Sequence, residues 1–398
     1  MDIDDERTIG WRLWRVRDAR GKSLRVIAEL AGMSKATLSR IERGERSPTL
    51  NEIVALADAL QISVSELTRL PVPAPANGHT DSTIEAIGLA LDAIDVDQPG
   101  GLVLPVAVLR DQVADIHRHG RACQFAKVAT DLPGLIRDLH TTLATGTDHG
   151  ELLELAVYLH VHATRSWLRH AAAPAHLLRR VVFLARRLAQ ERGEVTTLAV
   201  AGVGVVDVLR RGGALDLAQA ELDATTVPPT TAGTAGLIGV LTSKHALIAA
   251  LARRPGDVAA PMDAAAELAD RFGATGEIGS LGFLYPPAAV GKERMWLALE
   301  TGEPDRAVSI AQDVDPGQLS FPVNRAQYWI DRGRASARLR GRHDDAVRAL
   351  RTAESIFPTK VHRDAMVRDV FVVLLRHSRR NAVGQELQAM ARRAGLSV

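Results

Sequence analysis

Residues 34–43 place basic and small polar side chains at the spacing of one helix face. A short helix is expected here, with Leu38 and Ile41 turned into a core. The side chains that this helix presents to solvent are Lys35, Ala36, Ser39 and Arg40, with Thr37 at the margin. Long cationic side chains donate to guanine O6 and N7, and small methyl-bearing ones suit the thymine methyl group. The segment therefore predicts an edge that reads base pairs in a DNA major groove.

A second set of hydroxyl, amide and basic side chains flanks this edge. The members expected to contact the duplex beside the bases are Ser23, Ser34, Arg43, Ser47, Thr49 and Asn51. Such groups bind phosphates, and helix N-termini add backbone N–H donors. Phosphate contacts fix the orientation of a protein on DNA without reading its sequence. We expect these positions to orient the domain rather than to specify the operator.

Start and stop signals predict five short helices between residues 8 and 70. The expected N-caps of the first three are Thr8, Ser23 and Ser34. Thr49 with Glu52, and Ser63 with Glu66, have the spacing of a capping box and open the last two. Gly32 supplies a residue that tolerates positive φ between the second and third helices. Helix, Gly-containing turn and helix is the geometry that sets one helix in the major groove.

The charge of the chain is concentrated in this same region. The formal net charge is only +2, but residues 7–50 hold eleven Lys and Arg against four Asp and Glu, a local charge of +7. The remainder of the chain is therefore slightly acidic. A basic face on a near-neutral chain is typical of a polyanion-binding module.

Residues 23–49, SLRVIAELAGMSKATLSRIERGERSPT, resemble the Cro/repressor-type (XRE) helix-turn-helix family. The resemblance implies a five-helix domain that binds operator DNA, usually as a dimer. It also implies that Arg17 and Glu42 form a structural ion pair, so that neither reads bases. Trp11 and Trp14 depart from the small or charged residues usual in that family, and Trp14 is expected to be half exposed.

Residues 71–80 alternate proline with small residues and are expected to form an extended linker between a domain at 1–70 and a second at 81–398. Six helical hairpins follow, at a period of about 35 to 45 residues. The expected pairs are 150–170 with 174–191, 195–211 with 214–225, 232–252 with 261–272, 287–301 with 304–314, 323–340 with 344–356, and 361–377 with 381–394. In three turns, at Gly213, Gly302 and Gly341, an Ala follows five residues after the Gly and permits close helix approach.

These hairpins resemble the tetratricopeptide repeat (TPR), so the expected fold is all-α, a helix-turn-helix domain joined to an α-solenoid of TPR-like hairpins. Residues 132–140, 275–277 and 391–395 are similar to those of actinomycete regulators with a helical-repeat sensor domain. Residues 282–287 depart from the Phe-Gly-Pro-type loop expected there.

First helices of successive hairpins line the concave groove of a helical array. The side chains expected to contact a peptide or small ligand in that groove, or from the Gly-rich segment 273–287, are Trp167, Phe283, Tyr285, Arg294, Trp296, Asn324 and Tyr328. The alternative for each of these side chains is a place in the core or on the solvated surface, without contact to a ligand. A long Gly-rich loop inside a compact array is typical of a lid or of a simple connector.

Several classes of site find no support in the sequence. His117 with His119, and His160 with His162, point about 200° apart on a helix, so neither pair converges on a metal, and surface or half-buried histidines are expected. The single cysteine, Cys123, forms no internal disulfide. Phosphate-binding loop and nucleophile-elbow motifs are missing, so we expect no enzyme activity and no cofactor. Uninterrupted apolar runs are too short for a membrane span, and the acidic N-terminus is unlike a secretory signal.

These observations predict a cytoplasmic bacterial transcription regulator that binds a double-stranded DNA operator as a homodimer. The second domain is expected to dimerise and to sense a peptide or small-molecule effector. The alternative is a helical-repeat scaffold that recruits a protein partner to DNA without a diffusible ligand.

Overall fold

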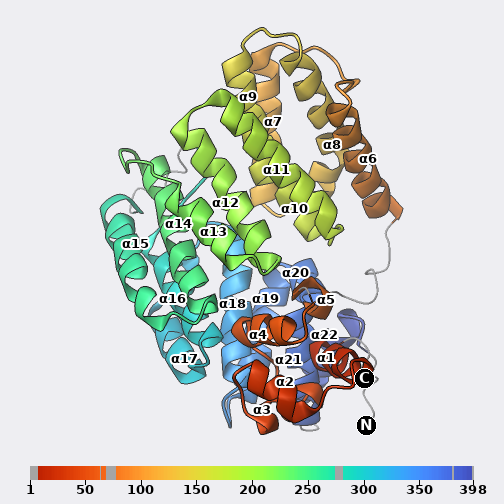
Figure 1. Ribbon diagram of the computed structural model, residues 1–398, viewed down its shortest axis with the longest axis vertical. Coiled ribbons are helices and arrows are strands. Elements are labelled where there is room, and N and C mark those ends of the chain that lie inside the picture. The colour runs from red at the N-terminus through yellow and green to blue at the C-terminus, as the bar shows by residue number, and fades with distance from the viewer. Residues whose placement is uncertain (1–7, 63, 69–77, 274–280, 379–380, 397–398) are drawn as a thin grey trace.

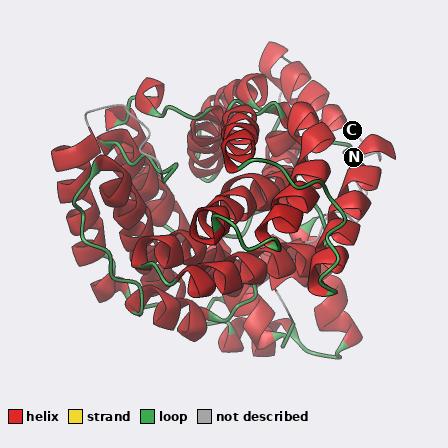
Figure 2. Ribbon diagram, turned by 90° about the horizontal axis from the view of Figure 1, so that it is seen from above, coloured by secondary structure: helices red, strands yellow, loops and turns green. Residues whose placement is uncertain are grey.

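The computed structural model describes residues 8–62, 64–68, 78–273, 281–378 and 381–396. Within these ranges every regular element is a helix, and none is a strand (Figure 2). The all-α prediction is confirmed.

The N-terminal domain contains the five expected helices. They are α1 (Ile9–Ala19), α2 (Leu24–Leu30), α3 (Lys35–Glu42), α4 (Leu50–Ala59) and α5 (Val64–Thr68). The hydroxyls of Thr8, Ser23 and Ser34 accept hydrogen bonds from the backbone at Trp11, Val26 and Thr37 respectively, as N-caps do. Thr49 and Glu52 form the predicted reciprocal capping box. Ser63, the predicted cap of α5, lies outside the described residues.

The core of this domain holds the apolar residues that helical periodicity predicts. Leu13, Leu38, Ile41, Ile53 and Leu56 are all buried. Gly10 stands where α1 crosses α3, and a Cβ built on it would lie 2.1 Å from the Ile41 carbonyl oxygen. The two helices therefore pack too closely for any larger residue at this position, which fixes the angle at which α3 is held.

Three helices open the second domain: α6 (Gly78–Asp95), α7 (Val106–Arg121) and α8 (Phe125–Leu143). The predicted linker falls largely on residues 71–77, outside the described part of the chain. All six predicted hairpins follow α8. Their first helices are α9 (His149–Tyr158) continuing into α10 (Arg165–His170), then α12 (Val195–Arg211), α14 (Ala232–Leu251), α16 (Pro287–Glu300), α18 (Pro322–Ala337), and α20 (Pro358–Arg363) continuing into α21 (Ala365–Arg376). Their second helices are α11 (Ala175–Arg192), α13 (Leu215–Asp223), α15 (Ala259–Phe272), α17 (Pro304–Asp313), α19 (His343–Ile356) and α22 (Ala382–Arg393).

The turns between hairpin helices have the predicted chemistry. Gly213, Gly302 and Gly341 all adopt positive φ, between 76° and 87°. The Ala residues five positions later, Ala218, Ala307 and Ala346, have no solvent exposure. Because a methyl group is the largest side chain that such a contact admits, the Gly-to-Ala spacing sets how closely the helices of a pair approach.

The hydrophobic interior runs along the array as three successive clusters of buried side chains. The first spans residues 87–281, the second 246–335 and the third 330–396. Each cluster overlaps the next in sequence, as expected when every hairpin packs on its neighbours. The head (residues 8–68) has a separate core.

Helix α14 is the one described helix long and apolar enough to cross a bilayer by length and composition. Its apolar window is 72% buried among other helices of the protein. Such burial is typical of the central helix of a packed core. The sequence analysis did not select it because small and polar residues interrupt its apolar runs.

The C-terminal end of the array lies beside the head. Figure 1 shows α1–α5 beside α18–α22, with α6 and α8 at the opposite end of the molecule. Helix α1 contacts α21, and α4 contacts α14. The head is thus packed on the repeats.

Candidate nucleic-acid interface

Helix α3 presents the predicted edge to solvent. Lys35, Ala36 and Arg40 are exposed, Thr37 and Ser39 are partly exposed, and the opposite face is sealed by Leu38 and Ile41. The Ser34 hydroxyl accepts a hydrogen bond from the Thr37 backbone N–H at 3.0 Å. This cap fixes the first turn of α3, which is the turn that carries Lys35 and Ala36.

The ion pair implied by family resemblance is present. Arg17 Nε and Nη2 donate to the two carboxylate oxygens of Glu42 at 2.6 and 2.8 Å, and Arg17 Nη1 donates to the Lys22 carbonyl at 2.8 Å. The hydrogen bond that Arg17 donates to Glu42 raises the pKa of Arg17. Both groups are largely buried. This fork ties α1 to the end of α3 and leaves neither side chain free to contact a base.

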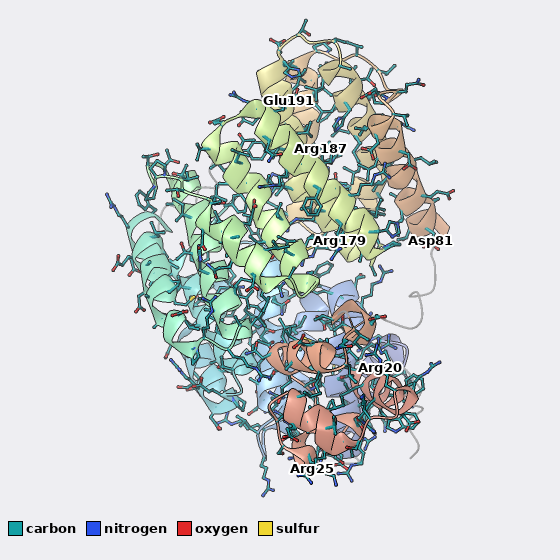
Figure 3. The ribbon with its side chains drawn as sticks, viewed as in Figure 1. Arg20, Arg25, Asp81, Arg179, Arg187 and Glu191 are labelled. Atoms are coloured by element: carbon teal, nitrogen blue, oxygen red, sulfur yellow. The ribbon has the colours of Figure 1, made fainter. Side chains whose placement is uncertain are left out.

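Ser23 and Arg43 lie at the borders of the exposed edge. Ser23 caps α2 and is exposed, as is Arg43, whose side chain contacts Glu45 at 3.1 Å. The basic side chains of Arg20 and Arg25 also lie on this outer part of the head, remote from α11 (Figure 3). The surface from Ser23 to Arg43 is therefore both positively charged and accessible.

Ser47, Thr49 and Asn51 are placed differently from the expectation that they face phosphates. Ser47 and Thr49 are buried. The Asn51 amide donates to the Ala250 carbonyl at 3.1 Å, and the Ser47 carbonyl accepts from Arg338 at 2.6 Å. In this conformation the repeats are bound to Ser47 and Asn51, and Thr49 is buried in its own capping box. Sequence reasoning from the head alone had no signal for this contact.

The first turn of α4 is bound by a carboxylate from the repeats. The Leu50 backbone N–H donates to Glu300, which is buried at the end of α16. Arg334 holds the other carboxylate oxygen of Glu300 at 2.8 Å. Burial alone would lower the pKa of Arg334, but Glu300 and then Asp331 outweigh burial and raise this pKa. Burial raises the pKa of Asp331 to about 6. Glu300 thus occupies a helix N-terminus of the kind that binds phosphate.

Two further contacts attach the head to the repeats. Arg253, in the turn after α14, donates to the Ala31 carbonyl at the end of α2. At the other end of the head, the Ile9 backbone N–H donates to Asp369 of α21 at 3.0 Å. The repeats therefore contact the head at α1, α2 and α4, while the predicted base-reading edge of α3 stays exposed.

The second candidate site is a cavity of about 1620 Å³ between the head and the two ends of the array. Of the seven residues predicted to contact a ligand, Phe283 and Asn324 line it. Trp167, Tyr285 and Tyr328 are buried in the core, which corrects their predicted place on a groove. Tyr328 donates its hydroxyl to the Ala311 carbonyl, and Trp167 its indole N–H to the Phe125 carbonyl. Trp296 packs on the core, and Arg294 pairs with Asp263 on the surface.

The histidines pair across helices rather than along them. His140 and His160 lie with Nε2 atoms 2.9 Å apart, and His117 stacks on His162 with ring centroids 4.8 Å apart. His160 is fully buried, so the expectation of surface or half-buried histidines is wrong there. Burial lowers the pKa of His140 and of His117 to about 4. These rings are neutral packing groups. The described residues contain no cluster of three metal-binding side chains.

Comparison with known proteins supports the class of the N-terminal domain. Residues 8–70 match a protein family described as a helix-turn-helix domain. The N-terminal domain is thus a helix-turn-helix domain, the class that points to a DNA-binding regulator.

Beyond that domain the comparisons are sparse. No curated protein matches this chain. Among solved structures, a chain in "Crystal structure of PrgX/iCF10 complex" is similar, with 10% sequence identity, a TM-score of 0.34, and coverage of 89% of this chain and 98% of the other.

Proposed function

We propose that this chain is a cytoplasmic, non-catalytic transcription regulator that binds a specific double-stranded operator. The observation that carries the proposal is the orientation of α3: its apolar side is sealed in the core, and Lys35, Ala36 and Arg40 stand in solvent. A helix held this way, next to a capped α2, has the geometry that enters a major groove. We further propose that it acts as a homodimer on two half-sites and belongs to the XRE type.

The operator is identified by selecting bound fragments from random DNA with the full-length chain. Lys35→Ala and Arg40→Ala should weaken operator binding about tenfold or more and leave binding to scrambled DNA nearly unchanged, because base contacts carry discrimination. Arg43→Ala should weaken both and flatten the salt dependence, as loss of a phosphate contact does. A wild-type chain that binds operator and scrambled DNA equally, with Arg40→Ala indistinguishable from it, contradicts the proposal. A two-fold symmetric selected site supports the dimer.

We also propose that the repeats regulate the head by covering it. In the docked arrangement the first turn of α4 is bound to Glu300, Ser47 and Thr49 are buried, and the Asn51 amide is bound to the Ala250 carbonyl. A head in this state offers α3 to bases but lacks the phosphate contacts around α4. An effector, a peptide or small molecule, that favours a released head would shift the population toward tight DNA binding, in proportion to its differential affinity for the two states.

A further inference from the structure

Three basic side chains line the cavity. They are Arg169 at the end of α10, Arg211 at the end of α12, and Lys360 in α20, together the basic triad. Among the described residues, no Asp or Glu forms an ion pair with any of the three, although Asp364 lies near enough to raise the pKa of Lys360. They come from the first, second and last hairpins, so the fold itself gathers these like charges.

The neighbouring Arg165, which lines the same cavity, differs from the triad because a carboxylate neutralises it. Its guanidinium pairs with Asp207 at 2.8 Å, and Lys244 binds the other oxygen of that carboxylate at 2.5 Å. Burial would raise the pKa of Asp207, but Lys244 and then Arg165 hold it well below its usual range. Asp207 is already shared by two cations and forms no ion pair with the basic triad, although it offsets part of the repulsion on Arg169.

The triad is electrostatically unfavourable as it stands. Arg169 and Arg211 are exposed and Lys360 is half-buried, but protein surrounds Arg169 and Lys360 on the scale over which a charge acts. Burial, followed by repulsion from Arg211, lowers the pKa of Arg169 to about 9. Burial and then Arg169 lower the pKa of Lys360 to about 8. An anion bound beside such clustered cations stabilises their charged forms.

The remaining wall is suited to an organic group. Phe125 and His170 stack with ring centroids 4.0 Å apart, and Phe357 lies parallel to them at 5.5 Å from His170. All three line the same cavity. His170 adjoins Arg169 in sequence, and Phe357 lies three residues before Lys360. The aromatic side chains are therefore next to the basic triad along the chain.

We propose that the cavity binds a small phosphorylated molecule, with its di- or triphosphate group held by Arg169, Arg211 and Lys360 and its organic part against Phe125, His170 and Phe357. Arginine forks and a lysine point charge are the side chains that recognise phosphate oxygens. The volume exceeds what such a molecule needs, which leaves room for water between ligand and wall.

The cavity also reaches the DNA-binding head. Trp11 and Arg15 of α1 form part of its wall, and α1 is fastened to α21 through Ile9 and Asp369. A bound polyanion attracts Arg15 as well as the triad, so occupancy changes the free energy of docking α1. This step, unlike binding itself, rests on the proposed regulatory function.

The test is calorimetric titration of the full-length chain with pyrophosphate and with ADP. Both should bind, ADP more tightly because of the aromatic wall. Arg169→Gln and Lys360→Gln should weaken pyrophosphate binding about tenfold each, and the matched control Arg348→Gln, at an exposed position of α19, should not. Absence of binding at millimolar pyrophosphate and ADP, or variants that bind as wild type does, overturns the proposal.

Two additional readouts keep the outcome interpretable. Without ligand, Arg169→Gln should unfold at the same or a higher temperature than wild type, because it removes repulsion; marked destabilisation would mean that its charge is satisfied within the fold and contradicts the proposal. Operator binding is measured separately on the same samples. Intact operator binding with no response to any phosphate compound overturns the anion site and leaves the regulator proposal standing.

Discussion

Glu300 and Leu50, 250 residues apart, meet where a carboxylate oxygen accepts the backbone N–H of the first turn of α4. The contact places a negative group from the repeats on a helix N-terminus of the DNA-binding head. A phosphate of a duplex and this carboxylate carry the same sign of charge and require the same donors. Under the proposed function, docking of the head therefore competes with the binding of a DNA phosphate at α4.

Releasing the head is expected to tighten DNA binding. Arg253→Gln removes the charged hydrogen bond to the Ala31 carbonyl without leaving a buried charge behind, since Arg253 is itself exposed. The population of undocked head rises, and operator affinity should increase about threefold to tenfold. Fluorescence anisotropy with labelled operator measures the change.

Arg254→Gln is the matched control for this experiment. Arg254 is the next residue, is also exposed, and pairs with Asp257 within the repeats instead of with the head. Its substitution alters net charge by the same amount and should leave operator affinity within about twofold of wild type. An equal increase in operator affinity in both variants would show that the effect comes from the change in net charge. No increase in operator affinity in Arg253→Gln would contradict the docking mechanism.

Glu300 also stabilises the array, so its substitution should lower the free energy of unfolding. Glu300→Gln leaves Arg334 buried with Asp331 as its remaining ion-pair partner, so a guanidinium that two carboxylates share keeps only one of them. Breaking a buried pair from one side costs about 3 kcal/mol. Urea denaturation followed by circular dichroism should show this loss, whereas Glu303→Gln, exposed in the next turn, should show almost none. A Glu300→Gln chain as stable as wild type would mean that Arg334 does not need that carboxylate.

The head and its core were predictable because local chemistry decides them. Caps at Thr8, Ser23, Ser34 and Thr49, and the period of Leu38 and Ile41, act within a few residues of chain. The covering of Asn51 was not predictable, because it depends on Ala250, which only the completed array brings near. The predicted groove position of Tyr328 was wrong for a related reason. The first helix of a hairpin has one side facing the groove and one facing the core, and the residue type alone does not distinguish the two sides.

Arg17 offers a test of structural against DNA-contacting roles within the head. Arg17→Ala removes both hydrogen bonds to Glu42 and leaves that carboxylate buried, so it should lower the free energy of unfolding by about 2 to 3 kcal/mol. Arg43→Ala, at an exposed site, should change stability by less than about 0.5 kcal/mol while weakening DNA binding. Thermal unfolding beside anisotropy measures both. If Arg17→Ala instead weakened DNA binding without loss of stability, and Arg43→Ala lowered stability, then Arg17 and not Arg43 would contact the DNA.

Lys360 should make anion binding in the cavity depend on pH. The groups that face it are Arg169, Arg211, Asp364 and Asp331. Burial and Arg169 lower the pKa of Lys360 to about 8, so its positive charge is present at pH 7 and is lost as pH rises through 8 in the empty protein. An anion favours the charged form and moves this loss to higher pH. Affinity should therefore fall progressively between about pH 8 and 10.

Sulfate is the probe for this measurement because it does not titrate in that range. The wild-type chain should bind sulfate about tenfold more weakly at pH 9.5 than at pH 7, the loss expected for one of three cations. Lys360→Gln should start weaker and lose less of its affinity over the interval, since it lacks the member of the triad whose pKa lies lowest. Identical pH profiles for the two chains would show that Lys360 does not face the bound anion, because a lysine in the binding site cannot lose its charge without changing the affinity.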